Sequence, residues 1–145
     1  MSDIAALVKA RLVAEVSAFD AIGIAANLGS AIAASSILPA AYVIRAGRSA
    51  EENTLGTGGH SQRITESFSV LIVDRVSGGV SGEATSLAVE ALCDEIQSAL
   101  IGWSPDAPRD PVNYVGGALV DWTEPALMIW IEDFMTVRYA RTLQR

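Results

Sequence analysis

The acidic side chains are the first candidates for chemistry in this sequence, because paired carboxylates can share acid–base work or hold a cation. Asp94 and Glu95 are neighbours in a segment with helical periodicity. Glu132 and Asp133 are neighbours in a strand-like segment, where successive side chains point to opposite faces. Neither pair has the spacing for shared catalysis, and no acid, base and nucleophile converge in the sequence. We therefore expect a protein that is not an enzyme.

The other reactive groups are equally isolated. Residues 51–53 (Glu-Glu-Asn) offer oxygen ligands, but in a polar loop such side chains are ordinarily solvated. Cys93 is the only cysteine and His60 the only histidine, so the sequence contains no disulfide framework and no metal-ligand spacing. We expect Cys93 to be a packed thiol in mid-helix, and we expect no cofactor or metal.

The composition predicts one soluble domain over residues 1–145. Half of the residues are apolar, enough for a core that buries roughly 70% of the unfolded surface without disulfides. The formal charge of −7 lacks the basic footprint that a nucleic-acid partner requires. Residues 21–44 carry no charge over a length that could span a bilayer. Glycines, serines and Pro39 interrupt that segment, so we expect no membrane role.

The longest patterned stretch runs from His60 to Trp103. Apolar residues alternate with polar ones around Phe68, which predicts a strand over residues 63–75. A glycine turn follows at residues 77–79. Apolar residues at three-and-four spacing then predict an amphipathic helix over residues 83–101.

The flanking segments predict the remaining elements. A first helix, capped by Ser2 or Asp3, is expected to run to about Val16. The later segments are a strand at 19–24, a helical turn at 27–34, a strand at 38–44, a hairpin loop at 47–59, a strand at 112–120 and a strand at 127–139. In the strand at 112–120, Gly116-Gly117 is expected to form a bulge or a close-approach point. The strand at 127–139 is expected to be covered in part on both faces. This order predicts an α+β fold (an α/β sandwich). We expect a four- to five-stranded mixed, largely antiparallel sheet with two main helices packed on one face.

Two of the predicted strands are too long for a compact domain of this size. At ~3.3 Å per residue, the segments 63–75 and 127–139 each reach about 43 Å, whereas a compact chain of this length is roughly 38 Å across. The strands must bend or project beyond the core. Because open sheet edges are a liability in a monomer, we expect projecting hairpins to become contacts in an assembly.

Six short motifs in a particular order carry a family resemblance. They are Leu38-Pro39-Ala40-Ala41-Tyr42-Val43-Ile44, Glu51-Glu52-Asn53, Gln62-Arg63 entering a strand with Phe68 and Val70, Leu100-Ile101-Gly102-Trp103-Ser104-Pro105, Tyr114-Val115-Gly116-Gly117, and Trp130 with Phe134. In this order they resemble the tail terminator proteins of long-tailed bacteriophages, which are related to minor tail and tail-completion proteins. Residues 140–145 match nothing in that pattern.

The resemblance implies a structural virion protein without catalytic residues. It would form a ring, typically a hexamer, that caps the tail tube, ends tube polymerisation at its final length and provides the head-joining interface. Its partners would be further copies of the chain, the tail tube protein and a head–tail connector or stopper protein, at the head-proximal end of a tail assembled in the host bacterial cytoplasm. DNA would pass through an acidic lumen without specific binding. Two alternatives are another head–tail neck ring protein (head-completion or stopper) and a non-viral protein-interaction domain.

The expected contacts between rings or subunits lie around the hairpin loop. We expect residues 47–59 to project towards a neighbouring ring, and three arginines nearby to pair with acidic groups across subunit boundaries. The contact candidates are Arg45, Arg48, Glu51, Glu52, Leu55, Gly56, Thr57, Gly58, Gly59 and Arg63.

Overall fold

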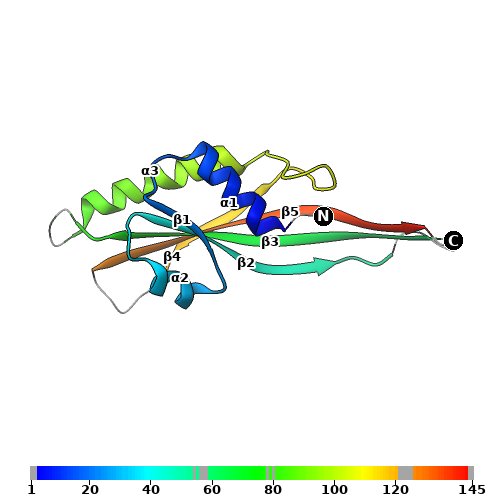
Figure 1. The fold of residues 1–145 in the computed structure, drawn as a ribbon, viewed down its shortest axis with the longest axis horizontal. Helices are drawn as coiled ribbons and strands as arrows, with labels where there is room; N and C mark the ends of the chain where they lie inside the picture. The colour runs from blue at the N-terminus through cyan, green and yellow to red at the C-terminus, as the bar shows by residue number, and fades with distance from the viewer. Residues whose placement is uncertain are drawn as a thin grey trace.

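A computed structural model of the protein describes residues 3–53, 55, 59–77, 79, 81–120 and 126–143. Its helices and strands follow the predicted order (Figure 1). They are α1 (Ile4–Glu15), β1 (Ala21–Ala25), α2 (Leu28–Ala34), β2 (Ala40–Ala50), β3 (Gly59–Arg75), α3 (Glu83–Leu100), β4 (Asn113–Leu119) and β5 (Leu127–Leu143).

The strands form one five-stranded sheet in the order β1-β2-β3-β5-β4. β1 pairs with β2 in parallel, and the other three pairs are antiparallel. The central strands β3 and β5 have 17 residues each and keep one register from Gly59↔Leu143 to Arg75↔Leu127. The expected α+β fold with a mixed, largely antiparallel sheet is confirmed.

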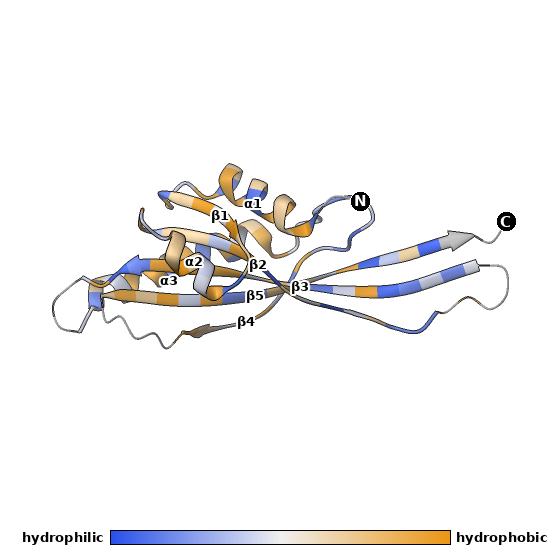
Figure 2. Cartoon of the chain, turned by 60° about the horizontal axis from the view of Figure 1, so that its bottom comes forward, coloured by the Kyte–Doolittle hydropathy of each residue, from blue (hydrophilic) through white to orange (hydrophobic). Residues whose placement is uncertain are grey.

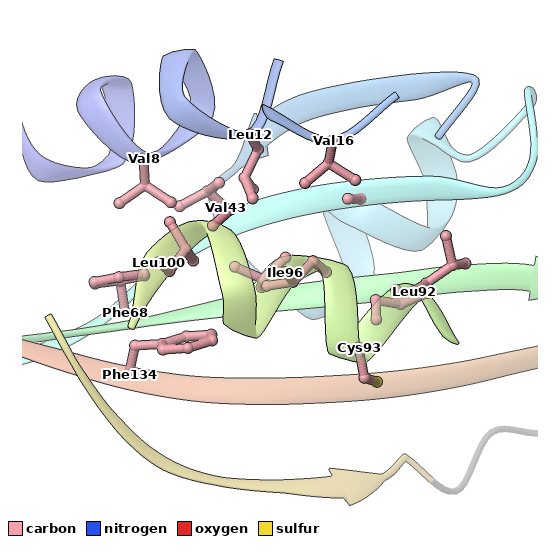
Figure 3. Close-up of a cluster of buried hydrophobic side chains, with 14 of the residues drawn as sticks. Val8, Leu12, Val16, Val43, Phe68, Leu92, Cys93, Ile96, Leu100 and Phe134 are labelled. Atoms are coloured by element: carbon pink, nitrogen blue, oxygen red, sulfur yellow. The ribbon is translucent and has the colours of Figure 1, made fainter. Parts of the chain in front are cut away.

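The main core lies between the sheet and the two long helices, which cover the same face (Figure 1). Leu12 of α1 and Ile96 of α3 are fully buried over that face (Figure 3). On the sheet, Phe68 of β3 stacks on Phe134 of β5, with 5.5 Å between the ring centroids. This arrangement explains the apolar stripes of both helices, because each stripe faces the same layer of strand side chains.

A smaller core lies on the opposite face of the sheet. Ala31 of the short helix α2 packs there with Leu71 and Val73 of β3 and Ile129 of β5. The middle of β5 is therefore buried on both faces, which confirms the expectation for the last strand. The uncharged segment 21–44 divides into β1, α2 and the start of β2, and none of the described helices has the length and hydropathy to cross a membrane.

Cys93 is buried in α3, as expected for a packed thiol (Figure 3). Burial, together with the nearby carboxylates Glu132, Glu90 and Asp94, raises the pKa of the thiol to about 12. The thiolate is the reactive form of cysteine, and this environment keeps the group protonated at neutral pH.

The start of α1 differs from the prediction. Asp3 occupies the N-cap position, but its side chain makes no capping hydrogen bond. Its carboxylate instead accepts from the guanidinium of Arg45 on β2, with Nε 3.0 Å from Oδ1. That contact holds the pKa of Asp3 below its usual value. Both side chains are about half-exposed, so this pair is a surface contact that ties the start of α1 to β2. Ser2 lies outside the described residues.

The predicted loop boundaries at residues 47–59 are wrong at both ends. β2 continues past a bulge between Arg45 and Gly47 and pairs as far as Ala50↔Ile64, and β3 begins at Gly59. β5 likewise runs beyond the predicted end, to Leu143. Small and polar residues give no strand signal by themselves. They are held in the sheet here because the long central strand β3 offers a continuous ladder of backbone donors and acceptors on both of its edges.

Candidate assembly interface

Beyond the helices, β2, β3 and β5 continue together as a three-stranded extension (Figure 1). We call this extension the arm and define it as residues 47–53, 59–67 and 136–143. A strand of 17 residues reaches about 56 Å at ~3.3 Å per residue. The long strands thus project from the core, as their length predicted.

The surface of the arm is different from that of the helix-covered half. Along β2, the residues from Ala40 to Ile44 are buried and those from Arg45 to Ala50 are exposed. Figure 2 shows hydrophobic colour gathered where helices cover the sheet, while the arm is largely polar. A small sheet is stable when one face packs on a partner layer, and no described helix covers either face of the arm.

A buried ion cluster ties the root of the arm to the core. Glu66 of β3 is only 3% exposed. Its Oε1 lies 2.9 Å from Nε of Arg109, in the connection between α3 and β4, and 3.3 Å from Nε of Arg138 on β5. Its Oε2 lies 3.5 Å from Nη2 of Arg48 on β2. One carboxylate therefore ties β3 to three other segments of the chain.

This cluster was not predicted from the sequence. A signal was present, because Glu66 continues the alternation of Val70 and Phe68 and so places a charge on the buried face of the strand. Its partner Arg109 is 43 residues away, in a proline-rich connection without periodicity. No sequence pattern links the two.

Side-chain hydrogen bonds hold the end of the arm. Nη1 of Arg63 lies 3.1 Å from Oε1 of Glu51. Oδ1 of Asn53 accepts from the backbone N–H of Ser61 at 2.7 Å and from that of Leu55 at 3.2 Å. The polar residues 51–53 thus help to build the arm, and the residues described contain no group of three or more His, Cys, Asp or Glu that could hold a metal ion.

Most of the contact candidates lie on the arm. Arg48, Glu51, Glu52, Leu55, Gly59 and Arg63 belong to it or to its end, and Leu55 is 43% exposed. Arg45 lies before the bulge and pairs with Asp3. Each of the three predicted arginines thus contacts a carboxylate of its own chain. Gly56, Thr57 and Gly58 lie outside the described residues.

Glu132 and Asp133 point to opposite faces of the sheet, as expected. Glu132 is buried and accepts from Nε1 of Trp130 at 2.7 Å, Nε2 of Gln97 at 2.8 Å and the hydroxyl of Tyr114 at 3.1 Å. Asp133 accepts from the hydroxyl of Ser69 at 2.5 Å. Burial, together with the hydrogen bond to Glu132, raises the pKa of Tyr114 to about 12. Glu132 therefore links β4, β5 and α3 as a structural group.

Gly117 is the close-approach point expected on β4. A Cβ at this position would lie 2.2 Å from Oε1 of Glu132, whereas a Cβ at Gly116 meets nothing within 4 Å. We expect Gly117→Ala to destabilise the fold by about 1–3 kcal/mol, the typical cost of overpacking. Urea unfolding followed by circular dichroism measures this loss. Gly116→Ala, one residue away on the same edge strand, is the matched control and is expected to cost clearly less. Equal losses in both variants would show that the contact with Glu132 is unimportant.

The helix-covered mixed sheet and its arm define a class of fold, a single α+β layer with a projecting three-stranded extension. Residues 1–144 match the family described as phage tail terminator protein, and the chain belongs to this family. The resemblance seen in the motifs is thereby confirmed, and the family is one of structural virion proteins.

Among solved structures, the chain is similar to a chain of the virion of a native gene transfer agent particle. The two are 14% identical, with 94% of this chain and 95% of that chain covered and a TM-score of 0.55. At this identity the likeness shows a shared fold. No sequence among the curated proteins matches this chain.

Proposed function

We propose that this protein forms a ring that caps the tail tube, ends tube polymerisation at its final length and provides the interface to which the head is joined. Membership of the tail terminator family carries this proposal. The virion particle that contains a chain of the same fold supports it. The partners would be further copies of the chain, with a hexamer as the expected ring, the tail tube protein and a connector or stopper protein.

The arm supports a role in assembly because it leaves strand surface that a monomer has no use for. Its two faces lack a covering helix, and β2 is its outer strand on one side. Exposed edges of this kind invite pairing with another chain. Leu55, at the end of the arm, adds an exposed apolar side chain that a neighbouring subunit or ring would cover.

The charge of the protein suits the proposed place in the virion. The formal charge of −7 would give a ring of several subunits a strongly negative field. Phosphates are repelled by such a field, so DNA would pass through the lumen during ejection without binding to it.

Electron microscopy of lysates from a phage that lacks this gene tests the proposal. We expect tails of uncontrolled, excessive length beside unattached heads, because nothing stops the tube from growing or offers a surface to the head. Supplying the intact gene from a plasmid is the control and should restore tails of normal length. Tails of normal length that fail to hold heads would instead indicate a neck protein that acts later. Complete, normal particles would contradict a role in either step.

A further inference from the structure

Charge is distributed unevenly between the arm and the rest of the chain. Within the arm as defined, the charged residues are Arg48, Arg63, Arg138, Arg141, Glu51, Glu52 and Glu66. The formal charges of these residues sum to +1. Because the whole chain carries −7, the residues outside the arm carry −8. Glu66 and its partner Arg138 are largely buried, with side chains 4% and 18% exposed. The accessible charges of the arm are then Arg48, Arg63 and Arg141 against Glu51 and Glu52, a small basic excess of +1, whereas the helix-covered half is acidic.

One face of the arm gathers side chains that are typical of interface anchors. Arg63 and Tyr139 are direct cross-strand partners, and Arg141 lies two residues further along β5, so all three share a face. The guanidinium of Arg141 lies 5.2 Å from the centroid of the Tyr139 ring. Tyr139 is 37% exposed and Arg141 is exposed. Tyrosine and arginine are enriched among the few residues that carry most of the binding energy of protein interfaces. We call these three residues the arm face. Arg63 also contacts a carboxylate of its own arm, with Nη1 3.1 Å from Oε1 of Glu51, so the arm face keeps a net positive charge through Arg141.

The outer face of α3 has the opposite character. The helix carries Glu83, Glu90, Asp94 and Glu95 and contains no lysine or arginine. All four carboxylates are on exposed residues, and among them Leu87 is 66% exposed. Asp94 and Glu95 also line a shallow cleft between α1 and α3, together with Glu15, Ser98 and Ala99. We call this surface the α3 face.

We propose that the arm face of one subunit docks on the α3 face of a second copy of this chain. The contact rests on the proposed ring and specifies how neighbouring subunits would be joined. Charge complementarity selects the partner, because a basic face with an aromatic anchor meets an acidic face with an exposed leucine. The arm projects away from the helices of its own chain (Figure 1), so the α3 face that it meets belongs to another copy.

The unlike character of the two surfaces suits a ring. A two-fold dimer through the arm face alone would place arginines against arginines. When the contact between two different patches is head-to-tail, it generates a closed ring if the rotation closes. In the proposed ring, each arm therefore docks on the α3 face of the next subunit, whereas a two-fold pair would need both arms to dock reciprocally.

Charge reversal in the full-length protein tests the contact. The arm variant Arg63→Glu/Arg141→Glu and the α3 variant Asp94→Arg/Glu95→Arg each place like charges together. We expect each to assemble at least tenfold more weakly than the wild type, as measured by light scattering across a dilution series at low salt. Circular dichroism checks that both remain folded. Arg141, Asp94 and Glu95 are exposed, whereas Arg63 is partly buried and also pairs with Glu51 at the end of the arm, so this check matters most for the arm variant. Arg75→Glu/Asp20→Arg, at exposed positions outside both faces, reverses one charge of each sign without changing the formal charge of the chain and should assemble normally.

Mixing the two variants gives the sharper result. In a ring where the two variants alternate, the reversed arm of one would meet the reversed α3 face of the other. At the next contact, the unchanged arm would meet the unchanged α3 face. We therefore expect an equal mixture to recover assembly that neither variant achieves alone. Arm variants that assemble like the wild type, or a mixture that stays unassembled, would overturn the proposed contact. Either outcome leaves the terminator function standing, because that function is judged separately by tail length in lysates that lack the gene.

Discussion

Replacing Glu66 with glutamine is expected to destabilise the protein by about 3–5 kcal/mol, the range measured when one partner of a buried ion pair is removed. The side chain of Arg109 is 2% exposed and lies 2.9 Å from the Glu66 carboxylate. Glutamine keeps the shape of the side chain but removes its charge. The guanidinium groups of Arg109 and Arg138 would then be close together with only Asp106, whose Oδ2 lies 2.8 Å from Nη1 of Arg109, left to compensate them. Urea unfolding followed by circular dichroism, at one fixed protein concentration, measures the loss.

A second variant at the same cluster shows how much of the lost stability depends on the burial of the charged group. Arg48 contacts the same carboxylate at 3.5 Å, but its side chain is 59% exposed. We expect Arg48→Gln to cost less than about 1 kcal/mol, as exposed ion pairs do. If Glu66→Gln were as mild as Arg48→Gln, the root of the arm would not depend on the buried cluster, and the arm would owe its position to the strand ladder alone.

Replacing Phe134 with alanine is expected to cost about 3–5 kcal/mol, the usual loss for truncating a buried phenylalanine. Phe134 is fully buried where β5 faces the long helices. Its ring stacks on Phe68 at 5.5 Å and meets the edge of Tyr114 at 5.4 Å. The alanine variant loses both aromatic contacts and leaves a cavity between sheet and helices that the long, rigid strands cannot close.

Denaturant unfolding of Phe134→Ala and of two control variants measures how much stability depends on the aromatic ring. Phe134→Leu fills most of the cavity, so it should lose clearly less stability than Phe134→Ala. Val115→Ala on the edge strand β4 truncates a side chain that is 62% exposed, and it should stay within about 0.5 kcal/mol of the wild type. A Phe134→Ala variant as stable as Val115→Ala would mean that the aromatic stack contributes little to the fold.

The surroundings of Phe134 and of Glu66 are stabilised by different kinds of interaction. Around Phe134, helices and sheet exclude water from apolar side chains. In the arm, backbone ladders and a few charged or polar contacts hold strands that have no helix above them. If the arm docks on a neighbour as proposed, part of its stability comes from the assembly, since a partner that binds the folded state stabilises it by mass action.

Hydrophobic periodicity and turn signals were enough to predict the order of the elements and the fold class, but the two central strands are 17 residues long and not 13 as predicted. These properties are local, because a period of two or of three to four residues is read within one segment. The strand around Phe68 and the helix through Ile96 follow that rule closely. The length of the predicted strands also required them to bend or to project beyond the core, and the structure shows that they project.

Tertiary structure decided what depends on residues far apart in the chain. Residues 47–50 are a strand only because β3 lies beside them, and Asp3 turns from the helix because Arg45, 42 residues away, reaches it. Glu66 and Arg109 form one ion pair across 43 residues. Likewise, the arm face exists only because β3 and β5 pair in one register. Such contacts depend on which strands become neighbours, and no local pattern of residue types contains that information.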